Sequence, residues 1–280
     1  MLLHFFCMEK IPCSVLILTR NSGATLERCL KNLGAFGEIL IHDANSEDDS
    51  VTIAKKFGAR VLRQYETEEK SVRITNFTEM RLKQRADAAF DWVLYIDSDE
   101  YLSDKLVSEI GDLLKNADPK TIIKFPRVSV IDGVPRTRGV AFPEIMPRIH
   151  HRKSGATLRA GKTVHEKYQY DSSFTEIITK APLYVPLDPV GVLQPKDDRY
   201  IELEVDRIRQ HGCSLRRYVR WFLLREPALT AWYFLKVLSV APFCFYRDSL
   251  PFSQNFRFVR YHWKLFFSVT GVVLQKYFHV

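Results

Sequence analysis

Two aspartates separated by a single residue, Asp97 and Asp99, directly follow the apolar run at 92–96. Carboxylates at positions i and i+2, on a turn that leaves a strand, can reach one hard cation. Mg²⁺ and Mn²⁺ take oxygen ligands and leave coordination positions for the phosphates of a substrate. A cation held in this way neutralises the charge that builds on a leaving diphosphate. The pair therefore predicts a divalent metal, Mn²⁺ or Mg²⁺, that acts on a phosphorylated substrate.

The elements that precede this pair indicate a parallel α/β sheet. Short apolar runs alternate there with segments in which apolar residues recur at helical spacing. Strands are predicted at 13–18, 38–42, 59–62 and 92–96, and helices between them at 26–33, 51–57 and 69–90. This order is typical of βαβ units with right-handed crossovers. Ligands of such sheets bind beyond the carboxyl ends of the strands, where polar residues stand at 19–21, 43–45 and 97–100.

The chain changes character near residue 199. A helix at 103–115 and a strand at 121–125 are followed by a proline-rich, mixed segment up to 198, in which we expect a hairpin and acceptor-binding loops. From Arg199 onward, arginines are mixed with apolar and aromatic residues, and the spacing is helical. The sequence therefore predicts two domains, 1–198 and 199–280.

Two apolar, aromatic stretches in the second domain, 228–246 and 256–280, could contact a membrane. The first is just long enough to span a bilayer, but Lys236 lies in its middle and Pro242 interrupts a helix. Interleaved Trp, Tyr and basic residues are instead typical of amphipathic helices that lie on an anionic membrane surface. The alternatives are a helical cap on the first domain and a dimer contact.

Charge and cysteine content restrict the partners and the compartment. The 280 residues carry a formal net charge of +8, which favours phosphates, anionic lipid or nucleic acid as partners. No RRM, KH or helix-turn-helix signature is present, so nucleic acid is not expected. The five cysteines have no CxxC spacing, which indicates a reducing compartment without disulfides or structural zinc. Residues 2–6 make a poor signal peptide because no basic region precedes them, and Met8 is an alternative start.

Three segments resemble family 2 glycosyltransferases. They read SVLILTRNSGATLERCLKNL at 14–33, EILIHDANSEDDSVTIAKKFGARVL at 38–62 and DWVLYIDSDEYLS at 91–103. The resemblance covers residues 13–115, extends more weakly to the region of residue 170, and is strongest to the lipopolysaccharide-core subgroup that includes heptose-linked glucosyltransferases. It implies an α/β fold of the GT-A type, with a Rossmann-like, mostly parallel sheet and flanking helices, followed here by C-terminal amphipathic helices.

The resemblance also implies an activity. Such enzymes move a sugar from a nucleotide-diphosphate donor, here expected to be a UDP-sugar, and invert the anomeric carbon. The implied acceptor is a glycan or glycolipid of the cell envelope, such as the lipopolysaccharide core. The protein is then expected in the cytoplasm, peripheral to the inner face of the plasma membrane, with an anionic membrane surface as a further partner.

Residues of the matching segments take donor-binding roles from the resemblance. Thr19 and Asn21 match the segment that cradles the nucleotide, and Asp43 matches the aspartate that contacts the base. Arg81 stands where the family often has a basic residue that can meet phosphate, and Asp97 belongs to both the donor site and the metal site. The family implies that the second aspartate of the pair is the main metal ligand.

The catalytic base is expected downstream of the metal-binding pair. An inverting transfer needs one carboxylate to take the proton of the attacking hydroxyl. Two candidates match family segments: Glu166 in a Val-His-Glu sequence, and Glu144 after Phe-Pro. His165 could orient the diphosphate or join Asp97 and Asp99 at the metal.

Two departures from the family pattern keep other functions open. The turn at 43–49 lacks the usual glycines, and Leu82 replaces the asparagine that often follows the basic residue at position 81. A catalytically degenerate GT-A-like protein that only binds at the membrane surface is therefore the alternative. A haloacid-dehalogenase-type phosphatase would have its aspartates on the first strand, and a sugar nucleotidyltransferase would have a glycine-rich first loop. Neither feature is present.

Overall fold

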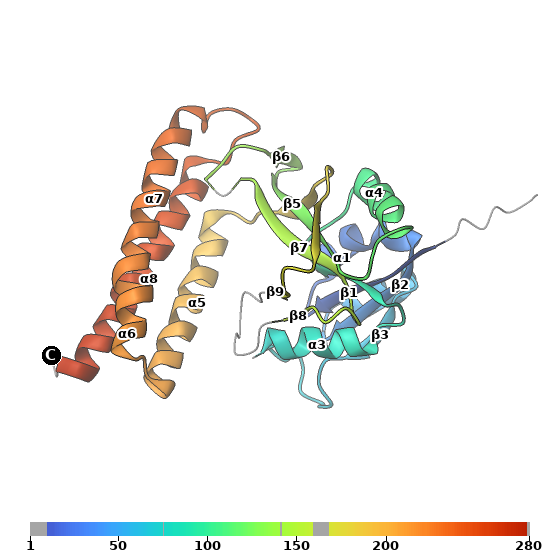
Figure 1. The fold of residues 1–280 in the computed structure, drawn as a ribbon, viewed down its shortest axis with the longest axis horizontal. Coiled ribbons are helices and arrows are strands. Elements are labelled where there is room, and N and C mark those ends of the chain that lie inside the picture. The colour runs from blue at the N-terminus through green and yellow to red at the C-terminus, as the bar shows by residue number, and fades with distance from the viewer. Residues whose placement is uncertain (1–9, 75, 141, 159–167, 279–280) are drawn as a thin grey trace, which may run out of the picture. The chain divides into compact units, whose positions relative to one another are not determined.

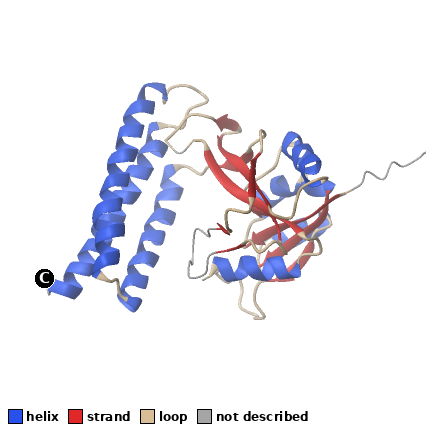
Figure 2. Ribbon diagram, viewed as in Figure 1, coloured by secondary structure: helices blue, strands red, loops and turns tan. Residues whose placement is uncertain are grey.

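The computed structural model describes residues 10–74, 76–140, 142–158 and 168–278, and the chain divides into two compact units (Figures 1 and 2). The sheet unit comprises residues 1–128 and 144–185, and the helical unit comprises residues 129–143 and 186–280. The long helix expected from residue 199 already begins at Val190. Pro195 lies inside this helix near its start, where the loss of one backbone hydrogen bond does not end it.

The sheet unit is built on a mixed sheet whose strand order is β10-β5-β7-β4-β1-β2-β3, with β11 and β6 also paired to β5. β1 to β4 form parallel pairs in the order β4-β1-β2-β3, whereas β7 is antiparallel to both β4 and β5. A separate short ladder joins β8 and β9. The strands are β1 (Ile11–Thr19), β2 (Phe36–Asp43), β3 (Arg60–Arg63), β4 (Trp92–Asp97), β5 (Thr121–Ile131), β6 (Val134–Arg136), β7 (Glu144–His151), β8 (Thr157–Leu158), β9 (Tyr168–Gln169), β10 (Thr175–Ile178) and β11 (Leu183–Pro186).

Both faces of the parallel strands are covered, which explains their nearly continuous apolar sequences. Val15 and Ile17 of β1 pack into the larger core with α1 (Gly23–Leu30), η1 (Leu33–Ala35), α2 (Ser50–Lys56) and α4 (Asp104–Leu114). Leu16, between them in the strand, points to the opposite face and packs with Val93 and Tyr95. The helix on that face is α3 (Phe77–Asp87), which reaches the carbonyl oxygens of β1 through its side chains.

The third helix is shorter than expected, because its first part binds the turn after β2 instead. The predicted helix at 69–90 begins only at Phe77. The backbone N–H groups of Ser71 and Val72 donate to the carbonyl oxygens of Asn45 and Ala44, at 2.9 and 3.0 Å. These donors are then unavailable to a helix, and Asn76 caps α3 by accepting a hydrogen bond from the Glu79 N–H group at 3.2 Å.

His150 of β7 lies buried on the α3 side of the sheet. Its ring stacks on Tyr95 with ring centroids 5.6 Å apart and meets Tyr168 edge-on at 5.1 Å. Burial, together with the nearby positive charge of Arg85, lowers the pKa of His150 to about 3. The imidazole is therefore neutral in the folded protein.

The helical unit contains α5 (Val190–His211), α6 (Leu215–Tyr218), the π-helical turn η2 (Val219–Leu224), α7 (Arg225–Val240), the 3₁₀ turn η3 (Ala241–Phe243) and α8 (Phe252–Phe278). α7 ends at Val240, two residues before Pro242, as the proline predicts. None of the helices in the described part of the chain combines the length and the apolar character that crossing a bilayer requires.

Replacing His150 by Phe should flatten the dependence of stability on pH. The unfolded chain binds a proton at this histidine below pH 6.5, whereas the folded chain does not until about pH 3. This residue therefore removes stability as the pH falls, by about 1.4 kcal/mol for each pH unit within that window. Urea unfolding at several pH values measures the effect, and identical slopes for the two proteins would contradict the neutral, buried assignment.

Candidate active site

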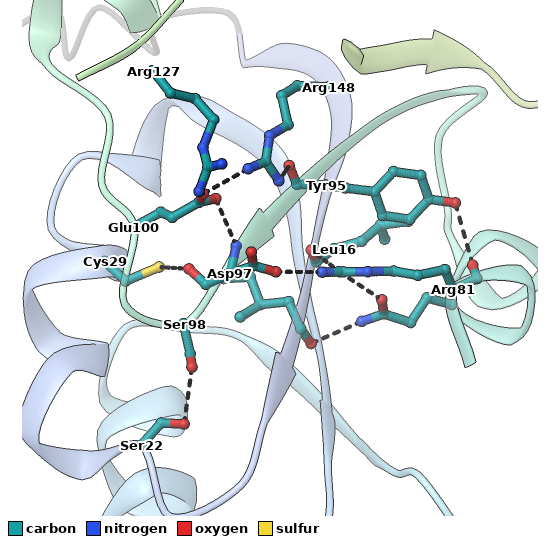
Figure 3. Close-up of polar contacts among 12 residues, drawn as sticks. Leu16, Ser22, Cys29, Arg81, Tyr95, Asp97, Ser98, Glu100, Arg127 and Arg148 are labelled. Atoms are coloured by element: carbon teal, nitrogen blue, oxygen red, sulfur yellow. Dashed lines mark hydrogen bonds and ion pairs between the residues drawn. The ribbon is translucent and has the colours of Figure 1, made fainter. Parts of the chain in front are cut away.

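The predicted site residues of the first two strands meet those of β4 at one edge of the sheet. In the strand register, Thr19 is the partner of Asp43, and Leu18 is the partner of Asp97. The three polar clusters that the sequence placed after β1, β2 and β4 therefore share the carboxyl edge, where ligands of such sheets bind. Figure 3 shows the polar contacts around the turn that leaves β4.

On the β1 and β2 side, the side chains hold one another through direct hydrogen bonds. The Thr19 hydroxyl donates to Oδ1 of Asp43 at 2.8 Å. Ser46 donates to the same carboxylate twice, through its hydroxyl at 2.6 Å and its N–H group at 2.8 Å. Asn21 joins this turn because its N–H group donates to the Ser46 hydroxyl, and its side-chain oxygen accepts from the Glu47 N–H group, both at 2.9 Å. Thr19, Asn21 and Asp43 thus form one connected group.

Two asparagines of the β1 and β2 turns adopt a backbone conformation that usually favours glycine. Asn45 has φ of 54° and Asn21 has φ of 49°, both in the left-handed region. Asparagine tolerates this region better than other residues with a side chain. The Asn45 amide also donates to the carbonyl oxygens of Thr67 and Glu69, at 2.7 and 2.8 Å. The turn at 43–49 is therefore ordered without the glycines that the family pattern contains.

Arg81 approaches the first aspartate of the predicted metal-binding pair. Its Nη2 donates to Oδ1 of Asp97 at 2.6 Å, and its guanidinium lies over the ring of Tyr95 (Figure 3). The Asp97 side chain is 50% exposed, whereas that of Arg81 is 9% exposed. Burial raises the pKa of Asp97, but Arg81 and two further arginines more than offset this, so the pKa lies below the usual range of an aspartate. Asp97 is an anion at neutral pH.

The turn after β4 is closed by its own residues and by the first helix. The N–H group of Glu100 donates to the carbonyl oxygen of Asp97 at 3.0 Å. The hydroxyl groups of Ser98 and Ser22 lie 2.9 Å apart, which joins this turn to the start of α1. Asp99, which lies between Ser98 and Glu100 in the sequence, has an exposed side chain.

Glu100 fastens this turn to the rest of the sheet. Its carboxylate accepts the N–H group of Asp97 at 3.0 Å, Nη2 of Arg148 at 2.6 Å and Nη2 of Arg127 at 3.1 Å (Figure 3). Arg148 also donates to the Tyr95 carbonyl oxygen at 3.3 Å. The carboxylate is 1% exposed and the Arg148 side chain 8%. Burial lowers the pKa of Arg148, but the nearby Glu100 and Asp97, with weaker contributions from Tyr168 and Glu144, together raise it above its usual value, so the guanidinium stays charged.

Of the two candidate base residues, Glu144 lies in the described part of the chain and Glu166 does not. Glu144 begins β7 and is half-exposed, and its Oε2 accepts Nη1 of Arg127 at 2.8 Å. Because Arg127 also binds Glu100, a single arginine connects Glu144 to the turn that carries Asp97. Glu166 and His165 lie outside the described residues.

A model of glycosyl transferase family 2 matches residues 14–166, more than half of the chain. The chain belongs to glycosyl transferase family 2. The sheet of this family 2 glycosyl transferase, with four parallel neighbouring strands, flanking helices and further C-terminal helices, is the GT-A-like fold that its sequence predicts. The resemblance to the lipopolysaccharide-core subgroup stays a prediction.

Several curated glycosyltransferases and solved structures are similar to this chain. Uncharacterized glycosyltransferases of Rickettsia felis and Rickettsia prowazekii are 32% and 33% identical over 104 residues, which are 37% of this chain and 33% and 32% of those proteins. The match thus spans about a third of the length of these relatives. TarS of S. aureus in complex with UDP-GlcNAc has a TM-score of 0.46 at 15% identity, covering 90% of this chain and 91% of TarS. Glucosyl-3-phosphoglycerate synthase from Mycobacterium tuberculosis, in complex with Mn²⁺, UDP and glucosyl-3-phosphoglycerate, has a TM-score of 0.30 at 24% identity, covering 43% and 44% of the two chains.

The donor set of this family 2 glycosyl transferase fits a hard divalent cation. Asp97 and Asp99 both end in carboxylates with exposed side chains, and Arg81 contacts only Oδ1 of Asp97. The described residues contain no cluster of three or more His, Cys, Asp or Glu that could hold a metal ion on its own. A cation between the two aspartates would therefore complete its coordination with other oxygens, such as those of a diphosphate.

The sequence did not identify the residues that position the site. Glu100 is the third acidic residue of the motif, but only its burial against β7 and β5 shows that it binds two arginines. Arg148 is a second such residue, because its side chain lies buried inside the sheet unit and binds Glu100.

Replacing Glu100 by Gln should destabilise the sheet unit strongly. The change leaves the buried charge of Arg148 without its partner, which typically costs about 3–5 kcal/mol. Glu144→Gln is the matched control, because Glu144 binds Arg127 at the surface, where such a pair is worth less than about 1 kcal/mol. Urea unfolding measures both variants. Equal, small losses would show that Glu100 does not anchor the turn.

Proposed function

We propose that the protein is a metal-dependent, inverting glycosyltransferase that uses a UDP-sugar donor. The observation that supports this most is the carboxyl edge of the sheet, where the group of Thr19, Asn21 and Asp43 stands next to Asp97 in the strand register. Membership of glycosyl transferase family 2 supports the class of reaction. The proposed roles are nucleotide binding by the first three residues and metal binding by Asp97 and Asp99.

The chain's own charges suit a bound diphosphate. Arg81 is fixed beside Asp97 by its stack on Tyr95, and its side-chain nitrogens remain close to the edge where phosphates would lie. The low pKa of Asp97 keeps this carboxylate ionised and ready for a cation at neutral pH. A bound Mn²⁺ or Mg²⁺ would supply Lewis-acid stabilisation of the leaving nucleoside diphosphate.

A single displacement at the anomeric carbon needs one general base and no protein nucleophile. In this step the acceptor oxygen bonds to the anomeric carbon, the bond to the diphosphate breaks, and the hydroxyl proton passes to a carboxylate. We infer that this carboxylate is Glu144 or Glu166. Glu144 is half-exposed. Its ion pair with Arg127 holds Oε2, and Oε1 could then accept the proton of a hydroxyl group.

The proposed acceptor is a glycan or glycolipid of the cell envelope, such as the lipopolysaccharide core. Support comes from the sequence resemblance and from the basic, aromatic C-terminal region. Such an acceptor is anchored in a membrane, so we propose that the protein works in the cytoplasm, at the inner face of the plasma membrane.

Asp99→Asn should abolish metal-dependent turnover while the fold persists. We expect Mn²⁺ with the correct UDP-sugar to raise the melting temperature of the wild type, because ligand at a hundred times its Kd adds about 2.7 kcal/mol. The variant should lose this rise and at least about 10²-fold in kcat. Asp112→Asn, which alters a surface aspartate 70% exposed, is the control and should keep both.

Two results would count against the proposal. Turnover that persists without added metal or in Asp99→Asn would exclude the metal role. Donor binding without any turnover, unchanged by Asp99→Asn, would instead favour the degenerate binding protein. A screen of UDP-, GDP- and dTDP-sugars distinguishes the nucleotide, since only the correct donor should raise the melting temperature.

Replacing the base by Gln should lower kcat by about 10²–10⁴-fold and leave donor binding intact. Glu144→Gln and Glu166→Gln are compared with the same acceptor, and each acts as the control for the other. The donor-induced melting shift reports that the nucleotide site is intact. If both variants retain the wild-type kcat, neither carboxylate is the base.

A further inference from the structure

The helical unit carries nearly all of the charge surplus of the chain. It contains 16 Lys and Arg against nine Asp and Glu, whereas the sheet unit contains 25 against 24. Seven of the eight surplus positive charges therefore lie in the helical unit. Such an excess on one unit favours an anionic partner.

Three basic residues of α8 form ion pairs with acidic residues of α5. Arg260 and Lys264 reach the carboxylate of Asp198 at 3.1 and 3.0 Å, and Arg257 approaches Asp197 at 3.5 Å. The sequence favoured a lipid contact for this stretch over a helical cap or a dimer contact, because nothing in the spacing of these cations shows that acidic residues of α5 face them. α8 is thus held within its own unit by ion pairs.

The outer face of α7 is apolar and exposed. Three large side chains recur there at helical spacing and are more than half exposed: Trp232, Leu235 and Leu238, at 55, 62 and 53%. Leu224, the last residue of η2 and the neighbour of the first residue of α7, is 63% exposed. The opposite face of the helix is buried, with Val237 and Glu226 at 1 and 2% exposure. We call the four exposed residues the α7 stripe.

The one charge in the middle of this helix does not interrupt the α7 stripe. Nζ of Lys236 donates to the carbonyl oxygen of Val140 at 3.1 Å and lies 5.2 Å from the centre of the Trp232 ring. The ammonium group is therefore turned to a backbone partner of the same unit. A long side chain with its charge bound to one side is compatible with an apolar surface around it.

Cations and aromatic rings lie at both ends of the stripe. Arg216, Arg217 and Arg220 are exposed at its beginning, and no ion-pair partner is found for them among the described residues. At the other end Phe245 is 94% exposed, and Arg138, which pairs with Asp248 at 3.1 Å, lies over the ring of Tyr246. Aromatic and basic residues next to an apolar strip are what a headgroup region accommodates.

We propose that the α7 stripe and the Phe245 tip bind the surface of an anionic bilayer, with α7 lying in the interface. The proposal rests on the proposed function for its role, since it would bring the enzyme to a membrane-anchored acceptor. A second copy of the chain is the other partner that could cover an apolar stripe. The charge argues against it, because two helical units would each bring seven surplus positive charges to the contact.

Leu235→Glu tests the surface directly. Binding is measured by flotation with vesicles of phosphatidylcholine and phosphatidylglycerol, and with vesicles of phosphatidylcholine alone. We expect the wild type to bind only the anionic vesicles, and Leu235→Glu to bind them at least about tenfold more weakly. Leu203→Glu is the matched control, because Leu203 is 45% exposed on α5, and it should bind like the wild type.

Three further measurements make the result decisive. Far-UV circular dichroism checks that both variants keep their helices. Phe267→Glu, at a residue 52% exposed on α8, should bind like the wild type if α7 rather than α8 meets the lipid. UDP-sugar hydrolysis without vesicles should be unchanged in Leu235→Glu, so a failure of the transferase assignment is seen separately.

The proposal is overturned if Leu235→Glu binds anionic vesicles as well as the wild type does, or if all three Glu variants weaken binding equally. It is also overturned if light scattering shows a dimer that Leu235→Glu dissociates while vesicle binding persists. In that case a second copy, and not lipid, covers the α7 stripe.

Discussion

The buried carboxylate of Glu100 is the constraint on which the site depends. A charge removed from water needs close cationic partners and hydrogen bonds. Arg148 of β7 and Arg127 of β5 provide the charge, and the N–H group of Asp97 provides a further bond. The strands β5 and β7, which hold neither residue of the proposed metal-binding pair, thereby fix the turn that presents Asp97.

Charge is balanced across the carboxyl edge of the sheet. Asp97 lies between Arg81 on one side and the arginines around Glu100 on the other, which keeps its carboxylate ionised. The β1 and β2 turns are held instead by hydrogen bonds that hydroxyl and backbone N–H groups donate to the carboxylate of Asp43. Such an arrangement is preorganised, so little rearrangement is needed when a charged ligand binds.

The two units differ in charge and in the character of their exposed surface. The sheet unit carries almost no net charge and contains the proposed donor site, whereas the helical unit carries the positive surplus and the exposed apolar stripe of α7. In the proposed function, the donor and the membrane would be bound by these separate surfaces. Function on this fold is set by such sites rather than by the scaffold.

The sequence alone determined the parallel core, since apolar runs bounded by polar turns report local burial, and it located Asp97, Asp99, Thr19 and Asp43 at strand ends. It also predicted that α7 stops before Pro242. It did not reveal that Arg148 forms an ion pair with Glu100, or that basic residues of α8 form ion pairs with Asp197 and Asp198. These pairs join residues distant in the chain. Only the tertiary structure decides which charges face a partner and which face solvent.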